Sequence, residues 1–245
     1  MKKKVGIIIL LLTFLAFSNS FAQDIEKETY GKGMEYDKDG KYDEAIAEFT
    51  KAIELNPNSA QAYNSRGVSY DNKAEYDLAI LDYNKALEIN PKYDKAYANR
   101  GYAYNAKGNY SQAILDCTKA IEINPNNDIA YANRGLAYLY QDNYKQAVSD
   151  FTNAVKINSY NDTAYAGLGL VYLSDENYEQ AISLFNNALR VNPKNAEAYA
   201  NRAAAYYYKQ EYEKAWADVH KAGAMGGKVN PELITLLKKS SNREN

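Results

Sequence analysis

The side chains that most often perform chemistry are scarce, because the 245 residues include a single Cys and a single His. Cys117 stands where equivalent segments of the chain carry Phe or Tyr, so we expect a small, buried apolar residue and not a nucleophile. His220 stands where those segments carry Thr or Asn, which predicts an exposed position. No nucleophile and base can be paired from these two, and no metal-ligand cluster or Gly-rich phosphate loop accompanies them. The sequence therefore predicts a protein that is not an enzyme and that carries no cofactor and no metal.

The charge balance argues against nucleic acid as a partner. The chain has 29 basic and 31 acidic residues, and the two signs are interleaved along its length. Binding to a phosphate backbone requires clustered Lys and Arg. We therefore expect no nucleic acid partner.

The first 22 residues have the three parts of a secretory signal peptide. Three lysines precede an apolar run from Val5 to Phe17, and Ser20 and Ala22 fit the small-residue cleavage rule. The run is shorter than the roughly 20 residues that a membrane-spanning helix needs. We expect cleavage after Ala22 and export to the periplasm or the outside of the cell. An uncleaved signal that anchors the chain to the membrane is the alternative.

An internal repeat of 34 residues organises the rest of the chain. The segments begin at Glu26, Ala60, Asp94, Asp128, Asp162 and Ala196, and each has the pattern of two amphipathic helices joined by a tight turn. Position 8 of the repeat is Gly in the first five segments and Ala203 in the last, and position 20 is always Ala. Small residues facing each other predict a close crossing of the two helices.

Tyrosine supplies the large repeat positions. Of the 25 tyrosines, 17 occupy positions 4, 11 and 17, where their rings are expected to belong to the repeat core. Position 32 is Pro in four segments, each time after Asn, and it ends the second helix. Ser159 replaces this Pro in the fourth segment, where we expect a looser joint.

This pattern of small residues, tyrosines and prolines resembles the tetratricopeptide repeat family over residues 26–229. The resemblance implies an all-α fold, a right-handed superhelical solenoid of antiparallel helix hairpins that acts as a binding scaffold. Residues from 230 onward resemble a helix start followed by an apolar face, which predicts a capping helix over the last repeat, with Trp216 beneath it. The predicted organisation is a signal peptide at 1–22, a lead-in at 23–25, repeats at 26–59, 60–93, 94–127, 128–161, 162–195 and 196–229, a capping helix at 230–239 and a disordered tail at 240–245.

Repeat positions 7 and 23 change together, which suggests that they touch as half-buried ion pairs between the two helices of a hairpin. The pairs are Lys32 with Glu48, Arg66 with Asp82, Arg100 with Asp116, Arg134 with Asp150, Leu168 with Leu184, and Arg202 with Asp218. The fifth pair is apolar at both positions, as expected if the two sites are in contact.

In the family that the chain resembles, positions 2, 5, 6, 9, 12 and 13 of the first helix line a concave groove. Carried over, this implies a largely polar groove in the first two repeats and an apolar, aromatic strip edged by asparagines in repeats three to six. The candidate partner-binding residues are Asn99, Tyr102, Asn133, Leu136, Leu139, Tyr140, Leu170, Leu173, Asn201, Tyr207 and Tyr208. The alternative for the leucines is packing against the next repeat. Asparagines at position 6 hold the backbone of an extended peptide in some members.

Two functions of different classes follow from this sequence. The first is an exported scaffold that holds a peptide or helix of a partner protein in the groove and so mediates protein–protein interaction or the assembly of an envelope complex. The second is an envelope protein that binds glycan or cell-wall fragments through its aromatic and asparagine side chains.

Overall fold

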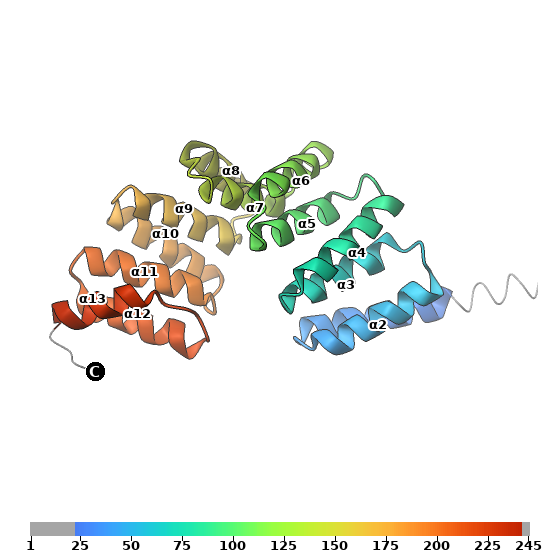
Figure 1. Ribbon diagram of the computed structural model, residues 1–245, viewed down its shortest axis with the longest axis horizontal. Coiled ribbons are helices and arrows are strands. Elements are labelled where there is room, and N and C mark those ends of the chain that lie inside the picture. Colours follow the sequence, from blue (N-terminus) through green and yellow to red (C-terminus); the bar gives the residue numbers. More distant parts are fainter. Residues whose placement is uncertain (1–22, 242–245) are drawn as a thin grey trace, which may run out of the picture. The chain divides into compact units, whose positions relative to one another are not determined.

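The structure is a computed structural model that describes residues 23–241, and within this range the chain forms helices and short connections without strands (Figure 1). The predicted signal peptide and residues 242–245 lie outside the described residues. Residues 23–38 are helical, so the expected lead-in at 23–25 is already part of the first helix. The helices that follow are α2 (Tyr42–Leu55), α3 (Ala60–Asn72), α4 (Tyr76–Ile89), α5 (Asp94–Ala106), α6 (Tyr110–Ile123), α7 (Asp128–Leu139), α8 (Tyr144–Ile157), α9 (Asp162–Ser174), α10 (Tyr178–Val191), α11 (Ala196–Tyr208), α12 (Tyr212–Ala224) and α13 (Pro231–Ser241).

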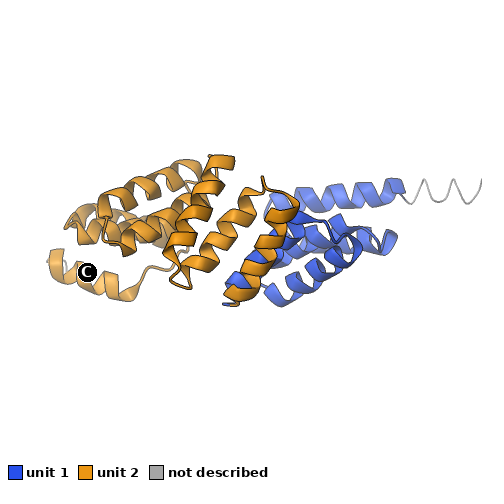
Figure 2. Cartoon of the chain, turned by 90° about the horizontal axis from the view of Figure 1, so that it is seen from above, with its two compact units in different colours: residues 1–108 blue, residues 109–245 orange. Residues whose placement is uncertain are grey.

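The chain divides into two compact units, residues 1–108 and residues 109–245 (Figure 2). In unit 1, α3 packs against α2, α4 and α5. In unit 2, α7 pairs with α8, α9 with α10 and α11 with α12, and α9 contacts both α7 and α11. Each unit is therefore built from antiparallel hairpins stacked on their neighbours, which confirms the predicted all-α hairpin fold.

Each hairpin begins with a helix that is capped by a side chain where the sequence offers one. Asn127, Asn161 and Asn195 accept a hydrogen bond from the backbone N–H three residues later, at 2.9 Å in each case. Such caps satisfy one of the N–H groups that a helix start leaves without an intrahelical partner. The helices α3, α5, α7, α9 and α11 begin at the same point of the 34-residue repeat, although Tyr93 before α5 provides no side-chain cap.

The end of the second helix is fixed by an asparagine and not only by the proline that follows it. Asn90 and Asn192 each accept a hydrogen bond from the backbone N–H two residues later, at 3.1 Å. Asn158 does the same from Tyr160 at 3.0 Å, although Ser159 replaces the proline there. The turn at Ser159 therefore forms without the proline, because this side-chain turn needs only the asparagine, and the looser joint expected there remains a prediction.

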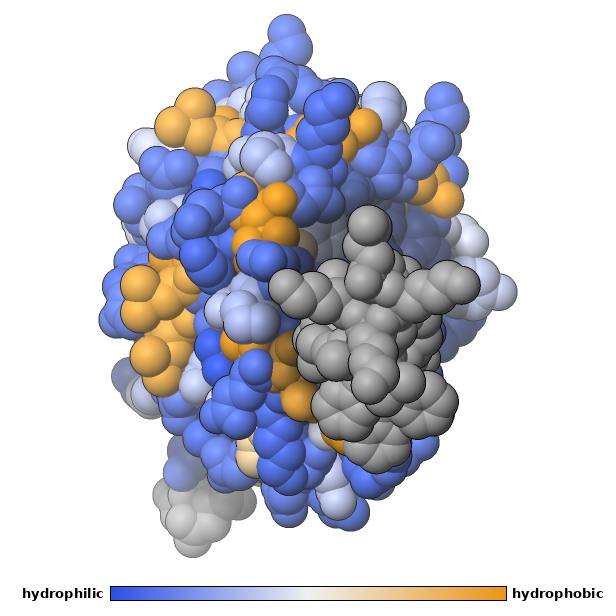
Figure 3. Space-filling model, turned by 90° about the vertical axis from the view of Figure 1, so that its right-hand side faces the viewer, coloured by the Kyte–Doolittle hydropathy of each residue, from blue (hydrophilic) through white to orange (hydrophobic). Residues whose placement is uncertain are grey.

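Hydrophilic residues separate the apolar ones on the outside of the molecule. On the face drawn in Figure 3, hydrophobic residues gather in several small patches bounded by hydrophilic residues. Within residues 23–241, no helix combines the length and the apolar character that crossing a bilayer requires.

A large ring lies against the backbone of the first helix in the hairpins that carry Phe49, Tyr83, Phe151 and Phe185 at position 24. A Cβ added at Gly135 would lie 2.8 Å from Phe151, and one added at Gly169 would lie 2.6 Å from Phe185. The glycine at position 8 therefore makes room for the ring at position 24 of the facing helix. The sequence correctly predicted a close crossing of the two helices. It named the alanine at position 20 as the residue that faces the glycine, whereas the structure places the ring at position 24 there.

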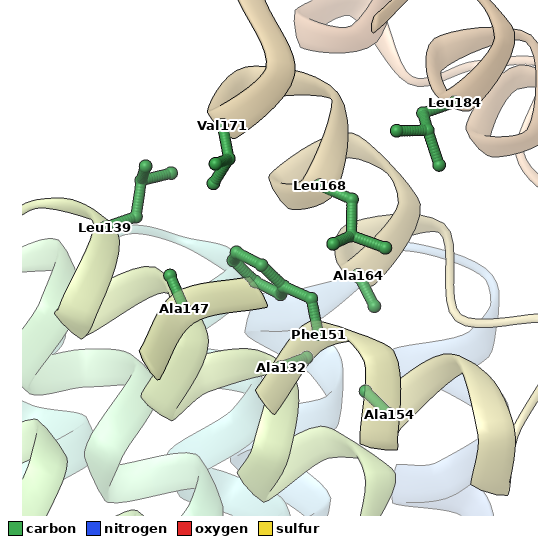
Figure 4. Packing of buried hydrophobic residues seen from close by; sticks show 9 residues of the cluster. All are labelled: Ala132, Leu139, Ala147, Phe151, Ala154, Ala164, Leu168, Val171 and Leu184. Atoms are coloured by element: carbon green, nitrogen blue, oxygen red, sulfur yellow. The ribbon is translucent and has the colours of Figure 1, made fainter. Parts of the chain in front are cut away.

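Phe151 shows how the ring connects consecutive hairpins (Figure 4). It belongs to α8 and packs with Leu139 of α7 and with Leu168 and Val171 of α9 in one buried cluster. A Cβ added at Gly167 of α9 would lie 2.3 Å from the ring. The same side chain is thus held between glycines of two different hairpins.

The predicted ion pairs form wherever an arginine occupies position 7 and both partners lie in one unit. Arg134 donates through Nε and a terminal nitrogen to the two carboxylate oxygens of Asp150, at 2.7 and 2.9 Å. The same two-bond geometry joins Arg66 to Asp82 and Arg202 to Asp218. These bonds to Asp150 raise the pKa of Arg134, so its guanidinium stays charged.

The three other position 7 and 23 pairs differ from these and from one another. Lys32 pairs with Glu28 at 2.7 Å and not with Glu48, which pairs with Lys51 at 2.6 Å. A lysine has no fork that matches a carboxylate, so its flexible ammonium takes the nearer partner within its own helix. Leu168 and Leu184 meet in one core cluster, as predicted. Arg100 and Asp116 belong to different units, and their contact remains a prediction.

The capping helix is longer than predicted. Helix α13 ends at Ser241 and not at residue 239, and its Leu233 and Leu237 are buried with Trp216. Trp216 Nε1 donates to Ser241 Oγ at 3.0 Å, and this hydrogen bond stabilises the last turn of the helix within the predicted tail. The expectation that Trp216 packs beneath the cap is confirmed.

Replacing Gly167 with Ala is expected to destabilise unit 2 by about 1–3 kcal/mol, because the new methyl group overlaps the Phe151 ring. Gly223→Ala is the matched control, since a Cβ there meets nothing within 4 Å and Ala favours the helix. Urea denaturation of both variants tests this. Equal urea midpoints for Gly167→Ala and Gly223→Ala would contradict the contact between Gly167 and the Phe151 ring.

Replacing Asp150 with Ala leaves the Arg134 charge half-buried without its partner and is expected to cost about 3 kcal/mol. The double change of Arg134 and Asp150 to Leu reproduces the apolar pair of Leu168 and Leu184 and is expected to recover most of that loss. Thermal unfolding of the single and double variants measures both. A double variant no more stable than the single one would contradict direct pairing.

Candidate partner-binding face

The candidate residues of unit 2 lie on three helices that contact one another in the order α7, α9, α11. We call their surface the first-helix face, because each of these helices is the first of its hairpin. The face is defined by Asn133, Leu136, Leu139, Tyr140, Leu170, Leu173, Asn201, Tyr207 and Tyr208.

Two tyrosines of the first-helix face are exposed, and a second tyrosine supports each of them. Tyr140 is 52% exposed and its ring stacks on Tyr110, with centroids 5.1 Å apart. Tyr208 is 54% exposed and stacks on Tyr178 at 5.2 Å. Partial burial, followed by the nearby Glu197 and Tyr110, raises the pKa of Tyr140, so this hydroxyl stays protonated at neutral pH. Each pair presents one flat ring with a hydroxyl to solvent.

The tyrosines near the end of α11 form a larger aromatic group. Tyr207 meets Tyr208 edge to face at 5.4 Å and lies tilted against Tyr212 at 5.9 Å. Tyr207 is itself packed against the cluster that contains Trp216. The aromatic group therefore joins an exposed ring to the core beneath the capping helix.

The four leucines of the face differ in how far they are covered. Leu139 is 9% exposed and belongs to the core cluster around Phe151, so a partner cannot reach it. Leu136 packs against the same cluster, and Leu170 and Leu173 pack against the cluster around Phe185, but these three are only partly buried. The alternative given from the sequence, packing against the neighbouring hairpin, therefore describes Leu139, and a role of the other three in binding remains a prediction.

The asparagines at position 6 differ in how far they reach the surface. Asn133 is buried, whereas Asn201 is half-buried. In unit 1, Asn99 of α5 is half-buried and its Nδ2 donates to Asn64 Oδ1 at 3.0 Å. Tyr102, also on α5, is exposed. Asn99 and Asn64 thus join neighbouring hairpins, while Asn201 has side-chain surface that remains accessible.

Hydrogen bonds between first helices continue through unit 1. Ser69 donates to Asp37 at 2.7 Å, and the Tyr30 and Ser65 hydroxyls lie 3.0 Å apart. The largely polar character predicted for the first two repeats is present, and its side chains bond mainly to one another. The first helices of unit 1 are joined by polar contacts where those of unit 2 are joined by leucines.

The side chains most able to do chemistry are placed as the sequence predicted. Cys117 is fully buried, and this burial raises the pKa of its thiol, which keeps it in the unreactive protonated form. His220 is exposed and lies beside Trp216 with ring centroids 5.7 Å apart. Among the residues from 23 to 241, no three His, Cys, Asp or Glu side chains are grouped to hold a metal ion.

Sequence reasoning missed the stacking of tyrosines between hairpins. It placed all position 17 tyrosines in the core, but Tyr110 and Tyr178 support exposed rings at position 13 of the next hairpin. The sequence contains a signal for this stacking, because Tyr110 and Tyr140 are 30 residues apart and Tyr178 and Tyr208 have the same spacing. Tyr144 has Ser174 at that spacing and is itself 36% exposed.

The neighbours Leu139 and Tyr140 provide a test of which residues form the surface. Leu139→Ala is expected to cost about 2–5 kcal/mol because it opens a cavity beside Phe151. Tyr140→Ala loses only a half-exposed stacked pair, worth about 1 kcal/mol. Urea denaturation of the two variants distinguishes them. Similar losses would mean that Tyr140 is a core residue.

Comparison with known proteins gives the family. The model described as Tetratricopeptide repeat matches residues 60–93, 94–127, 129–161 and 163–195, and a second, described as TPR repeat, matches residues 33–73. No curated protein gives a match to the chain.

Solved structures share the fold. The chain is similar to the APC/C hetero-tetramer Cut9-Hcn1, with a TM-score of 0.77, 20% identity, and coverage of 91% of this chain and 46% of that one. It thus spans about half the length of that structure's chain. A tetratricopeptide repeat protein from Parabacteroides merdae gives a TM-score of 0.61 at 22% identity over 89% of this chain and 88% of that one. YrrB, described as a TPR protein with an unusual peptide-binding site, gives 0.50 at 26% identity over 79% and 97%. Because the family models match consecutive segments from residue 33 to 195, the chain belongs to the tetratricopeptide repeat family.

Proposed function

We propose that the chain is an exported, non-catalytic scaffold that holds a peptide or helix of a partner protein on the first-helix face of unit 2. The observation that carries this proposal is the pair of exposed tyrosines, Tyr140 and Tyr208, each supported by a stacked ring. A tyrosine held in this way loses little side-chain entropy on binding and offers both an apolar face and a hydroxyl. Such residues are frequent energetic centres of protein interfaces.

Other features support a protein partner. The family fold is typical of scaffolds for protein–protein interaction, and YrrB, at 26% identity, is described as having a peptide-binding site. Asn201 adds hydrogen-bonding capacity to the face, and the packed leucines Leu170 and Leu173 keep the helices in place. The role of the leucines in this proposal is thus to position the surface.

The glycan-binding function is the second candidate, and the same tyrosines favour it, because flat exposed rings also pack against sugar rings. The two proposals differ in the class of molecule that is captured. A protein partner is expected to use the hydroxyls and asparagines as well as the rings.

The proposed location rests on the residues at the N-terminus of the sequence. Expression of the full chain, cell fractionation and N-terminal sequencing of the product test it. Export predicts a mature chain that begins at Gln23 and is found outside the inner membrane or in the medium. A full-length chain that remains with the membrane would support an uncleaved anchor instead.

Binding can be tested by capture from the native envelope fraction with the wild-type chain and with the double variant Tyr140→Ser, Tyr208→Ser. The variant is expected to weaken binding of the captured protein by at least about tenfold, as for loss of central interface residues. Titration calorimetry with the identified partner measures the change.

Tyr160→Ser is the matched control, because Tyr160 is 76% exposed but lies in the connection between α8 and α9. It is expected to bind as the wild type does. Equal binding by all three proteins would overturn the assignment of the face. Saturable binding of purified cell-wall glycan that the double variant loses, without a captured protein, would favour the second candidate.

A further inference from the structure

Unit 1 contains a buried carboxyl group that the proposed function does not use. Asp71, on α3, is only 9% exposed. Its Oδ2 accepts a hydrogen bond from the Tyr83 hydroxyl at 2.6 Å, whereas its Oδ1 is buried and has no hydrogen-bond partner. An ionised carboxylate in such a place would leave a charged oxygen without compensation, which is costly.

The hydrogen bond to Asp71 lies where three helices meet. Tyr83 belongs to α4 and is fully buried, and it packs in one cluster with Ala103 of α5. A Cβ added at Gly67 of α3 would lie 2.6 Å from its ring. The Tyr83 ring is therefore one of the contacts that hold α3, α4 and α5 together in unit 1, and Asp71 is bonded to its hydroxyl.

The charged groups on the surrounding elements do not supply a cation to Asp71. Lys73, at the C-cap of α3, pairs with Asp43 of α2 and with Glu75, and Arg66 pairs with Asp82 of α4. Lys107, which follows α5, pairs with Asp77 of α4, Lys85 of α4 pairs with Glu88, and Arg100 of α5 donates to Asn84. Asp37 of the helix at 23–38 accepts from Ser69, and Tyr102 of α5 interacts with Tyr83. Each of these cations has another partner, and none of them acts on the Asp71 carboxyl group.

We infer that Asp71 is a protonation-dependent lock in unit 1, which holds α3, α4 and α5 together when its carboxyl group is neutral and loosens their packing when it ionises. The neutral acid carries its proton on Oδ1 and accepts from Tyr83 on Oδ2. Loss of the proton to solvent leaves a buried charge at the Tyr83 contact. Unit 1 thereby senses the pH of the compartment in which the protein works, and this holds whatever partner unit 2 binds.

The direction of the pH effect follows from the two states of the chain. Burial is the main cause that raises the pKa of Asp71 to about 7 in the folded protein, and the Tyr83 hydrogen bond partly opposes it. The unfolded chain releases this proton near pH 4. Between about pH 4 and 7 the folded form holds a proton that the unfolded form has lost, so unit 1 becomes less stable as the pH rises. Above that window the loss is complete.

Hydrogen exchange of the α3–α5 amides in the full chain, corrected for the intrinsic exchange rate, measures the opening of this joint. In the wild type, the opening equilibrium constant is expected to rise by up to about tenfold per pH unit between pH 5 and 7. Asp71→Asn, which mimics the neutral acid, is expected to remove that rise. Asp39→Asn removes an exposed carboxylate of the same unit and is expected to keep it. Identical pH dependence in the wild type and Asp71→Asn would overturn the inference.

Two further measurements keep the inference testable if Asp71→Asn does not fold. The carboxyl carbon of Asp71 in the wild type is expected to titrate near neutral pH in NMR spectra, and titration near pH 4 would overturn the lock.

Tyr83→Phe removes the hydrogen bond that favours the ionised form of Asp71 and is expected to move the pH window of the exchange effect to higher pH. Phe is the residue at this repeat position in three other hairpins, so the ring contact is retained. An exchange effect at the same or a lower pH would count against the hydrogen bond between Tyr83 and Asp71.

Discussion

The contact between an aromatic ring and a glycine backbone sets the spacing of these hairpins. A ring at position 24 fits only where the facing residue has no side chain, as Phe151 does beside Gly135 and Gly167. Two hairpins lack the ring: Cys117 stands at position 24 of the third, and in the last Val219 stands there while Ala203 replaces the glycine. Since one ring touches two hairpins, the packing inside a hairpin and the stacking between hairpins are the same interaction.

The spacing that the rings impose also determines which surface side chains meet. It brings position 13 of one hairpin against position 17 of the preceding one, where Tyr140 stacks on Tyr110. The same geometry places Lys73 beside Asp43 and Lys209 beside Glu179, one residue further along each helix. The exposed rings are therefore fixed by the core, and no additional loop or insertion is needed to position them.

The sequence was sufficient for the parts of the structure that repeat. Spacing and residue size predicted the helices, the arginine–aspartate pairs and the cap over Trp216. The sequence was insufficient where neighbouring residues differ mainly in burial, as Leu139 and Tyr140 do. A repeat position gives the side of the helix on which a residue lies, but not how far the next hairpin covers that residue. Lys32 shows a second limit, since paired residue types predict contact only when the donor geometry suits the acceptor.

The two units differ in what joins their first helices, and this difference has an energetic consequence. Unit 1 uses hydrogen bonds such as Ser69 to Asp37 and Asn99 to Asn64, each worth about 1 kcal/mol net because water replaces it on opening. Unit 2 uses leucines such as Leu139, worth roughly 1.5–3 kcal/mol when fully buried, and Leu170, which is partly buried and contributes less. Both units add ring contacts between hairpins, such as Tyr83 in unit 1 and Phe151 in unit 2. The buried acid of unit 1 therefore acts on a joint that combines a ring with polar contacts, whereas the tyrosines of unit 2 stand on leucines.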